Sequence, residues 1–261
     1  MSEWEDFEKA CTSYLNEHFG KYAKFTHKGG SNSTVSDIFV ETYNDSFYID
    51  AKLLPSQCGQ FVLFPDTVKK SFQYSDNNAN LIDEYAEKII DNMNKNFDLF
   101  YNAGTAGKDV IMADGQEVFS KWIIKMYKAK NTRFFITNGY NIIPVDRMLE
   151  FFEISATYRI KRSGTSSVGK NKISLVRDYV INDCLLEISR TEEDKLFIVS
   201  PEKMNNKSFE LFGSEYIFSL RDKEYEVRKR GKTNNANVIF SIKHKKNTKG
   251  LSKEEFIAYL S

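Results

Sequence analysis

The stretch SDIFVETYNDSFYIDAKLLPSQCGQ, residues 36–60, decides the fold that we predict for this chain. Two short apolar runs, Ile38–Val40 and Phe47–Ile49, consist of residue types that favour β-strands. The polar cluster Asn44–Ser46 between them has the composition of a turn. The two runs are therefore predicted to form a β-hairpin, and the rest of the chain is interpreted around it.

Three charged residues stand at the end of this hairpin that lies away from the turn. Side chains at i and i+2 share one face of a strand, so Asp50 and Lys52 are expected to point the same way. With the turn centred near residues 44–45, Asp37 is expected roughly opposite Ala51 or Lys52. Two close carboxylates repel each other unless a cation lies between them, and oxygen ligands suit Mg²⁺. The hairpin thus predicts a Mg²⁺ site that hydrolyses a phosphodiester.

The same residues also fit a hairpin that carries an exposed salt bridge. An acid followed two positions later by lysine is common in a chain with 28% charged residues, and it recurs at Glu193 and Lys195. No acid-bearing strand precedes that second pair, so we interpret it as solvated. At Asp50 and Lys52 the charges interrupt apolar strands, a place where natural sequences give up stability for function. The metal site is therefore the favoured interpretation of the hairpin.

Length and composition indicate one large domain, or a domain with a subdomain, that has a core of its own. The chain has 261 residues, of which 41% are hydrophobic. The acidic segment Met1–Asp6 is unlike a signal peptide, and no apolar run approaches membrane-spanning length. Three distant cysteines, Cys11, Cys58 and Cys184, argue against a disulfide framework and favour a reducing cytoplasm. With three histidines in the chain, no zinc-ligand spacing occurs either.

Charge is distributed unevenly along the chain, although the net charge is +1. Residues 1–100 contain 9 basic and 16 acidic residues, whereas residues 158–261 contain 21 basic and 14 acidic ones. The windows 154–177 and 227–253 contain six and nine basic residues and no acid. Such windows are typical of a surface that binds a polyanion, the alternative being a solvated positive face. Beside a candidate phosphodiesterase site, nucleic acid is the favoured partner.

Two segments in these windows are interpreted as DNA-binding. Residues 161–170 form a basic, hydroxyl-rich loop that is expected to be flexible and to wrap a DNA groove. Residues 228–237 combine Arg, Lys, Thr and Asn, a mixture suited to reading bases and holding phosphates, or else to a basic hairpin turn. The predicted DNA-binding residues are Arg159, Lys161, Arg162, Ser163, Lys170, Arg228, Lys229, Arg230, Lys232, Asn234, Asn235 and Asn237.

The remaining pattern predicts a mixed sheet flanked by helices. Helices are expected over residues 3–19, 81–101, 118–127, 148–154 and 253–260, the last with a capping box at Ser252 and Glu255. Strands are expected over residues 22–26, 61–64, 133–136, 140–145, 156–160, 185–188, 196–199, 216–220, 225–229 and 236–242. Glu8, on the first helix, is interpreted as a surface glutamate rather than as a group that reaches the metal site. Residues 28–34 form either a phosphate-binding or a plain loop.

Asp37 followed by Asp50-Ala51-Lys52 resembles the PD-(D/E)xK nuclease motif, with Ser36 in place of the usual proline. Because that proline carries no chemistry, the departure is minor. The chain as a whole resembles HhaI-like type II restriction endonucleases. The segments that carry this likeness are 7–8, 33–38, 47–52, 56–63, 157–164 and 235–242, of which 56–63 is distinctive.

The resemblance implies a restriction-endonuclease-like α/β fold with a mixed β-sheet core flanked by helices and a β-rich C-terminal part. It implies a single endonuclease domain, 1–261, with a catalytic core in 1–150 and DNA recognition in 151–261. The implied activity is that of a type II site-specific deoxyribonuclease of the bacterial cytoplasm, which requires Mg²⁺ and cuts both strands of duplex DNA at GCGC. A DNA methyltransferase of the same restriction-modification system is implied as a functional partner.

The resemblance also assigns roles at the hairpin. Asp37, Asp50 and the Ala51 carbonyl would hold the metal, Lys52 would position the attacking water, and Gln60 would be a supporting polar group. A structure-specific repair or junction nuclease and a DNA-binding module without catalysis remain alternatives. The number of metal ions and the choice between monomer and dimer stay open.

Overall fold

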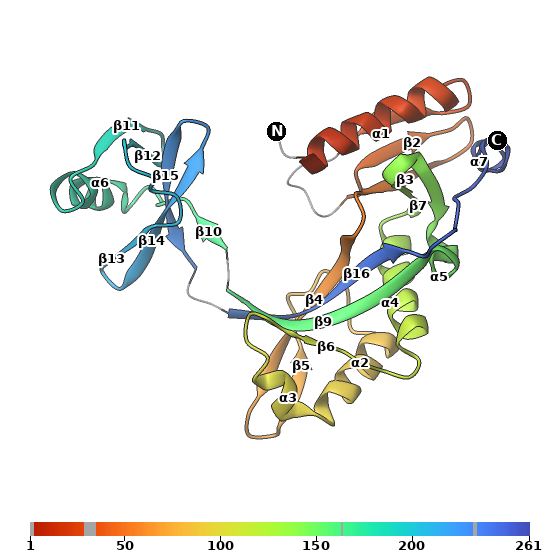
Figure 1. Cartoon of the computed structure of the whole chain (residues 1–261), viewed down its shortest axis with the longest axis horizontal. Coiled ribbons are helices and arrows are strands. Elements are labelled where there is room, and N and C mark those ends of the chain that lie inside the picture. Colours follow the sequence, from red (N-terminus) through yellow and green to blue (C-terminus); the bar gives the residue numbers. More distant parts are fainter. Residues whose placement is uncertain (1–2, 29–34, 163, 232–233) are drawn as a thin grey trace. The chain divides into compact units, whose positions relative to one another are not determined.

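The computed structural model describes residues 3–28, 35–162, 164–231 and 234–261, with the side chains of residues 161, 162, 234 and 235 left aside. The chain forms two compact units, residues 1–160 with 236–261, and residues 161–235 (Figure 1). The predicted α/β class is confirmed. The expected division at residue 150 stays a prediction, and the compact units have other bounds because residues 236–261 belong with the N-terminal part.

The first sheet of the first unit contains the predicted hairpin. Its strands follow the order β1-β2-β3-β7-β8. Figure 1 labels β2, β3 and β7. Their bounds are Lys24–His27 for β1, Ile38–Glu41 for β2, Ser46–Lys52 for β3, Thr132–Thr137 for β7 and Asn141–Pro144 for β8. Strand β3 runs parallel to β7, and the other neighbours are antiparallel. The predicted β2–β3 hairpin is confirmed. Strands β7 and β8 form a second hairpin, whose turn Asn138–Tyr140 has Gly139 at φ 73°.

Two terminal helices pack on one face of this sheet. Helix α1, Glu3–Phe19, ends where the Gly20 N–H donates to the Asn16 carbonyl, and α7, Lys253–Leu260, begins with the predicted capping box. Leu15 and Phe256 from these helices share a buried cluster with Ile49 of β3. Because side chains alternate along a strand, Asp50 and Lys52 face the opposite side of the sheet.

That opposite side faces the larger core of the unit, which contains a second sheet and four helices. The sheet has the order β5-β4-β16-β9-β6. These strands are Ser71–Tyr74, Ser56–Asp66, Asn234–His244, Phe152–Arg162 and Lys108–Asp109, respectively. The helices are α2, Glu84–Asn94, α3, Phe97–Tyr101, α4, Gly115–Ala129, and α5, Met148–Phe151, the last preceded by the 3₁₀ turn Val145–Arg147. Helix α4 joins the two sheets, since Trp122 stacks on Phe240 at 4.5 Å while Tyr127 packs edge-on against Phe135 at 4.9 Å.

The prediction of one helix over residues 81–101 is wrong. Asp83 caps the N-terminus of α2 by accepting hydrogen bonds from the N–H groups of Tyr85 and Ala86, so Leu81 stays outside and is 92% exposed. The backbone of Asn96 leaves the helical region, with φ −128° and ψ 40°, and separates α2 from α3. The helix expected over 148–154 likewise ends early, at Phe151, and β9 begins at Phe152.

The second unit contains a third sheet with the order β11-β12-β15-β14-β13, and β10 pairs with β15. The strands are Thr165–Ser166 for β10, Glu187–Thr191 for β11, Leu196–Val199 for β12, Ser208–Leu211 for β13, Ser214–Arg221 for β14 and Glu224–Arg230 for β15. Helix α6, Ile173–Asn182, packs Val176 and Val180 against this sheet. Sequence reasoning missed α6 because β-branched residues at its buried positions weaken the helical signal. It also missed β13.

The three cysteines are free thiols, and Cys11 and Cys58 are buried. The expectation that they form no disulfide framework is therefore confirmed. Within the four described ranges, no helix is both long and apolar enough to cross a membrane.

Gly59 in β4 is required by its backbone and by its neighbours. Its φ is +105°, a region that side chains strain, and an added Cβ would lie 2.9 Å from Cζ3 of Trp122. We expect Gly59→Ala to lower the free energy of unfolding by about 1–3 kcal/mol, as overpacking of a core does. Denaturant unfolding followed by circular dichroism measures this change.

The matched control for this variant is Gly164→Ala. An added Cβ at Gly164 meets nothing within 4 Å, so the added methyl group has no neighbour to displace. We expect its unfolding free energy to stay within about 0.5 kcal/mol of the unchanged chain. Equal stability of the two alanine variants would show that the Trp122 contact relaxes without cost.

Candidate active site

The hairpin brings Asp37, Asp50 and Lys52 together at one end of β3. Ile38 pairs with Ile49 in the hairpin register, which places Asp37 opposite Asp50. The predicted position opposite Ala51 or Lys52 is therefore wrong. The cause is the turn Thr42–Asp45, closed by a 2.9 Å hydrogen bond from the Thr42 N–H to the Asp45 carbonyl, whose centre lies earlier in the chain than we expected.

The Asp50 carboxylate is buried and is held by two donors. Lys52 Nζ lies 2.6 Å from its Oδ2, and the Tyr127 hydroxyl donates to the same oxygen at 2.9 Å. Asp50 and Lys52 share a face of β3 as predicted, and Tyr127 reaches them from α4. The contacts of Lys52 and Tyr127 are therefore both made to the Oδ2 atom of Asp50.

Asp37 is held from the backbone of the neighbouring strand. Its Oδ2 accepts a hydrogen bond from the Ala51 N–H at 2.8 Å. The N–H and C=O of one strand residue point to the same side, so the Ala51 carbonyl also faces the Asp37 side of β3. Strand β2 begins at Ile38, one residue after Asp37. The two carboxylates and this carbonyl are thus three oxygen donors at one strand end.

The electrostatics of the site are those of two like charges in a poorly hydrated place. Burial and the nearby Asp50 carboxylate raise the pKa of Asp37 to about 8, although Lys52 and the Ala51 N–H oppose the shift. Burial lowers the pKa of Lys52, but the combined effects of Asp50, Cys58 and Asp37 outweigh it and the net pKa is raised. The lysine therefore stays protonated, and the carboxylate pair lacks enough positive charge to ionise fully near neutral pH.

This donor set fits Mg²⁺, which prefers oxygen ligands and keeps several waters. A cation between the carboxylates would relieve the repulsion that raises the pKa of Asp37. No group of three or more His, Cys, Asp or Glu side chains is arranged for a metal in the described ranges. Two carboxylates and a carbonyl are accordingly all that the hairpin offers, and the other ligand positions are left to water or substrate.

Glu8 is buried and its charge acts on Asp37, so its interpretation as a surface residue is wrong. Its side chain is buried and lies 3.0 Å from Nε2 of His27, the last residue of β1. Its charge adds to the rise in the pKa of Asp37 and also, after burial and Asp37, to the rise in the pKa of Cys11. The spacing of Phe7, Cys11 and Leu15 predicts a helix from the sequence. The sequence does not predict which elements pack around Glu8 on that helix.

Tyr127 and Ser36 are further polar residues that sequence reasoning did not assign to the site. Tyr127 is the last residue of the helix expected over residues 118–127, and nothing in the sequence links it to Asp50. Ser36, which replaces the proline of the motif, is buried and contacts the Thr132 hydroxyl at 2.8 Å. This contact therefore connects Ser36, the residue before Asp37, to the first residue of β7.

The predictions for Gln60 and for the loop 28–34 remain untested. Gln60 is exposed on β4 and accepts a hydrogen bond from Gln57 at 3.1 Å, so a catalytic part for it stays a prediction. Of the candidate phosphate-binding loop 28–34, residues 29–34 lie outside the described residues.

Two predicted DNA-binding arginines lie on β15 of the second unit and are paired with acids. Arg228 donates to Glu226 at 2.6 Å and to the hydroxyl and carbonyl of Thr165. Arg230 pairs with Glu215 at 2.7 Å. Acids that are absent from the basic window in sequence are therefore supplied by the fold, and they neutralise part of its positive charge.

The predicted flexible loop 161–170 is partly ordered by the same strand. Its strand β10 pairs with β15, and Lys170 forms an ion pair with Glu193. Lys229 lies half-buried on β15. Glu193 and Lys195, which we interpreted as solvated, both lie at the surface.

Two further predicted DNA-binding residues, Arg159 and Asn237, lie on strands of the second sheet of the first unit. In the described part of the chain, the buried Nε of Arg159 on β9 has no hydrogen-bond partner. Asn237 on β16 is 2% exposed and pairs with Val62. Ser163 and Lys232 lie outside the described residues, as do the side chains of Lys161, Arg162, Asn234 and Asn235.

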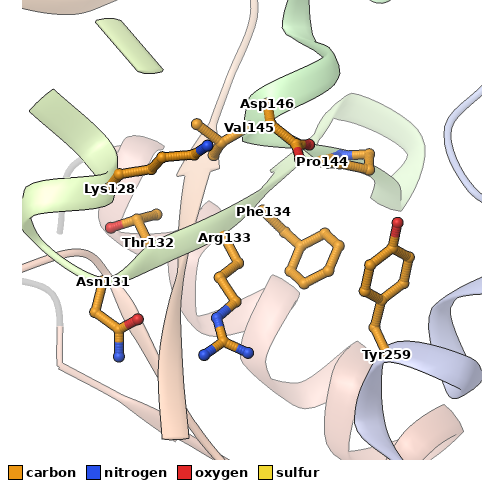
Figure 2. A pocket seen from close by; sticks show the side chains of 9 residues that line it. All are labelled: Lys128, Asn131, Thr132, Arg133, Phe134, Pro144, Val145, Asp146 and Tyr259. Carbon is orange, nitrogen blue, oxygen red and sulfur yellow. The ribbon is translucent and has the colours of Figure 1, made fainter. Parts of the chain in front are cut away.

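A pocket of about 270 Å³ lies elsewhere on the first unit (Figure 2). Lys128, Arg133 and Tyr259 are among its lining residues, and Asp37, Asp50 and Lys52 are not. Arg133 is bound to Asp45 at 2.6 Å. The carboxylates are therefore separate from this pocket.

Comparison with known proteins gives one match. No family model and no curated protein matches the sequence. A solved structure of HhaI endonuclease in complex with DNA matches with a TM-score of 0.84 and 35% sequence identity, and the alignment covers 99% of this chain and 98% of that one. Likeness at this identity over nearly the full length of both chains shows more than a shared fold. The chain belongs to the HhaI-like family of type II restriction endonucleases and is a site-specific nuclease.

Proposed function

We propose that this endonuclease cuts both strands of duplex DNA at GCGC in a reaction that requires Mg²⁺. The observation that carries the proposal is the buried carboxylate pair beside a protonated lysine at the end of β3. The HhaI endonuclease that this chain resembles was solved with DNA, which supports DNA as the substrate here.

Asp37 and Asp50, with the Ala51 carbonyl, would hold the ion. Mg²⁺ bound there would lower the pKa of a water and offset the charge that builds on the phosphoryl oxygens. Asp37 would hold the ion in its ionised form, because the ion would supply the positive charge that the pair lacks.

Lys52 is positioned by Asp50 and cannot serve as a base while it is protonated. Its ammonium orients the attacking water by donating a hydrogen bond to it, and it stabilises the charge of the pentacovalent phosphorane. The products are 5′-phosphate and 3′-hydroxyl ends.

The basic segments would hold and read the DNA. Phosphates take Lys and Thr, and a site made of G·C pairs favours Arg on guanine O6 and N7, which suits the arginines of β9 and β15. We further propose a bacterial, cytoplasmic restriction-modification system in which a DNA methyltransferase protects the sites of the host.

Plasmid cleavage tests this function. With Mg²⁺ present, we expect discrete fragments whose sequenced ends map to GCGC, and with a chelator we expect intact plasmid. A plasmid methylated at GCGC serves as the matched control and should stay uncut. A smear, fragments that map to another sequence, or a preference for branched over linear DNA would each contradict the proposal.

A further inference from the structure

Tyr127 sits between the core and the candidate metal site. Its side chain is 5% exposed, and its hydroxyl donates to Asp50 Oδ2 at 2.9 Å. The Cys58 thiol lies 3.8 Å from the same hydroxyl and donates to it. A hydrogen-bond chain thus runs from β4 through α4 to the catalytic strand β3.

The ring of Tyr127 is fixed in place by its neighbours. It packs edge-on against Phe135 at 4.9 Å, and Phe135 is the residue of β7 that pairs with Asp50. Lys52 Nζ lies 5.9 Å from the ring centroid on another side. A hydroxyl on a ring held in this way has one direction in which to donate, and that direction is Asp50.

The second donor matters because a carboxylate turns easily. The terminal torsion of aspartate has broad, roughly two-fold preferences, so a single contact does not fix it. Lys52 and Tyr127 both contact Oδ2, and they reach it from different elements. Together they define the plane of the carboxylate and leave Oδ1 as the oxygen for a further ligand.

We propose that Tyr127 is a positioning residue of this endonuclease, which orients Asp50 so that its Oδ1 meets the metal ion. The inference rests on the proposed Mg²⁺ site. A hydroxyl that was merely satisfied inside the core would have no effect on ion affinity, and this difference makes the two interpretations separable.

Tyr127→Phe removes the hydroxyl and keeps the ring. We expect the affinity for Mn²⁺, titrated into the DNA-free protein and followed by electron paramagnetic resonance, to fall about 10–100-fold, as when other residues that orient metal ligands are lost. The Mg²⁺ concentration for half-maximal plasmid cleavage should rise by a similar factor. Cleavage should recover, at least in part, at high Mg²⁺.

Tyr158→Phe is the matched control. Tyr158 lies in the same buried cluster, and among the described residues its buried hydroxyl has no hydrogen-bond partner. We expect its ion affinity and Mg²⁺ dependence to stay within about twofold of the unchanged enzyme. Near-UV circular dichroism establishes that both variants keep the native packing.

Unchanged Mn²⁺ affinity in Tyr127→Phe would overturn the proposal, and so would cleavage that is lost at every Mg²⁺ concentration without weaker ion binding. Failure of the unchanged protein to cut DNA would refute the proposed function alone. In that event the Mn²⁺ titrations of the two variants still show whether the Tyr127 hydroxyl affects ion binding.

Discussion

Asp37→Ala is expected to abolish DNA cleavage by this endonuclease while leaving DNA binding largely intact. The substitution removes one of the two carboxylates that would hold the ion, and it leaves the Ala51 N–H without its acceptor. A bound metal supplies several kcal/mol of charge stabilisation in the transition state. Since each 1.36 kcal/mol is a factor of ten in rate, the loss should be about 10³-fold or more.

The measurement is single-turnover cleavage of a labelled duplex that contains one GCGC, with binding followed by fluorescence anisotropy. Asp45→Ala is the matched control, because Asp45 belongs to the same hairpin but lies exposed in its turn, paired with Arg133. We expect that control to cut within about threefold of the unchanged enzyme, as for exposed ion pairs elsewhere. Full cleavage by Asp37→Ala would mean that the hairpin acids are structural and that the nuclease site lies elsewhere.

The hairpin could be predicted from sequence because its signals are local. Apolar residues of strand-forming type on both sides of a polar turn specify two paired strands, and the i, i+2 spacing places Asp50 and Lys52 on one face whatever the register. The register itself depends on which four residues close the turn. Thr42 caps that turn with its hydroxyl, which accepts from the Asp45 N–H at 3.0 Å, and this shifts the pairing from our expectation.

Glu8 and Tyr127 could not be predicted because their partners come from distant parts of the chain. Tyr127 meets a carboxylate 77 positions away. A buried tyrosine looks the same in sequence whether its hydroxyl reaches a carboxylate or, like that of Tyr158 on β9, meets no partner among the described residues. The packing of α4 and α1 against the first sheet decides both cases.

The basic windows show the converse difficulty. Their freedom from acids is a property of the sequence, whereas charge acts through space. Glu226 stands directly before the window that begins at Val227 and shares β15 with Arg228, and the antiparallel pairing of β14 with β15 brings Glu215 beside Arg230. Counting charges along the chain therefore overstates the positive charge available to DNA.

In the absence of divalent cations, the free energy of unfolding is expected to fall as the pH rises from 5 to 8. The pKa of Asp37 is about 8 in the folded protein, whereas the ordinary value for an aspartate, which applies to the unfolded chain, is 3.8. Between these values the folded protein keeps a proton that the unfolded chain has released, so raising the pH favours unfolding. The limiting slope is about 1.4 kcal/mol per pH unit, and the coupling to Asp50 makes about 2–4 kcal/mol a reasonable total.

Asp37→Asn removes the titrating group and keeps the shape of the side chain. The free energy of unfolding of this variant should vary little over this pH range, because it has no Asp37 carboxyl to titrate. At pH 8 it should exceed that of the unchanged protein by about 2–4 kcal/mol, and at pH 5 the two values should nearly agree. Denaturant unfolding in a chelating buffer measures both curves, with Asp45→Asn as the exposed control. Adding Mg²⁺ at pH 8 should then stabilise the unchanged protein and not Asp37→Asn, because the ion replaces the proton between the two carboxylates. A stability that rises between pH 5 and 8 in the metal-free protein would show that the carboxylates do not share a confined site.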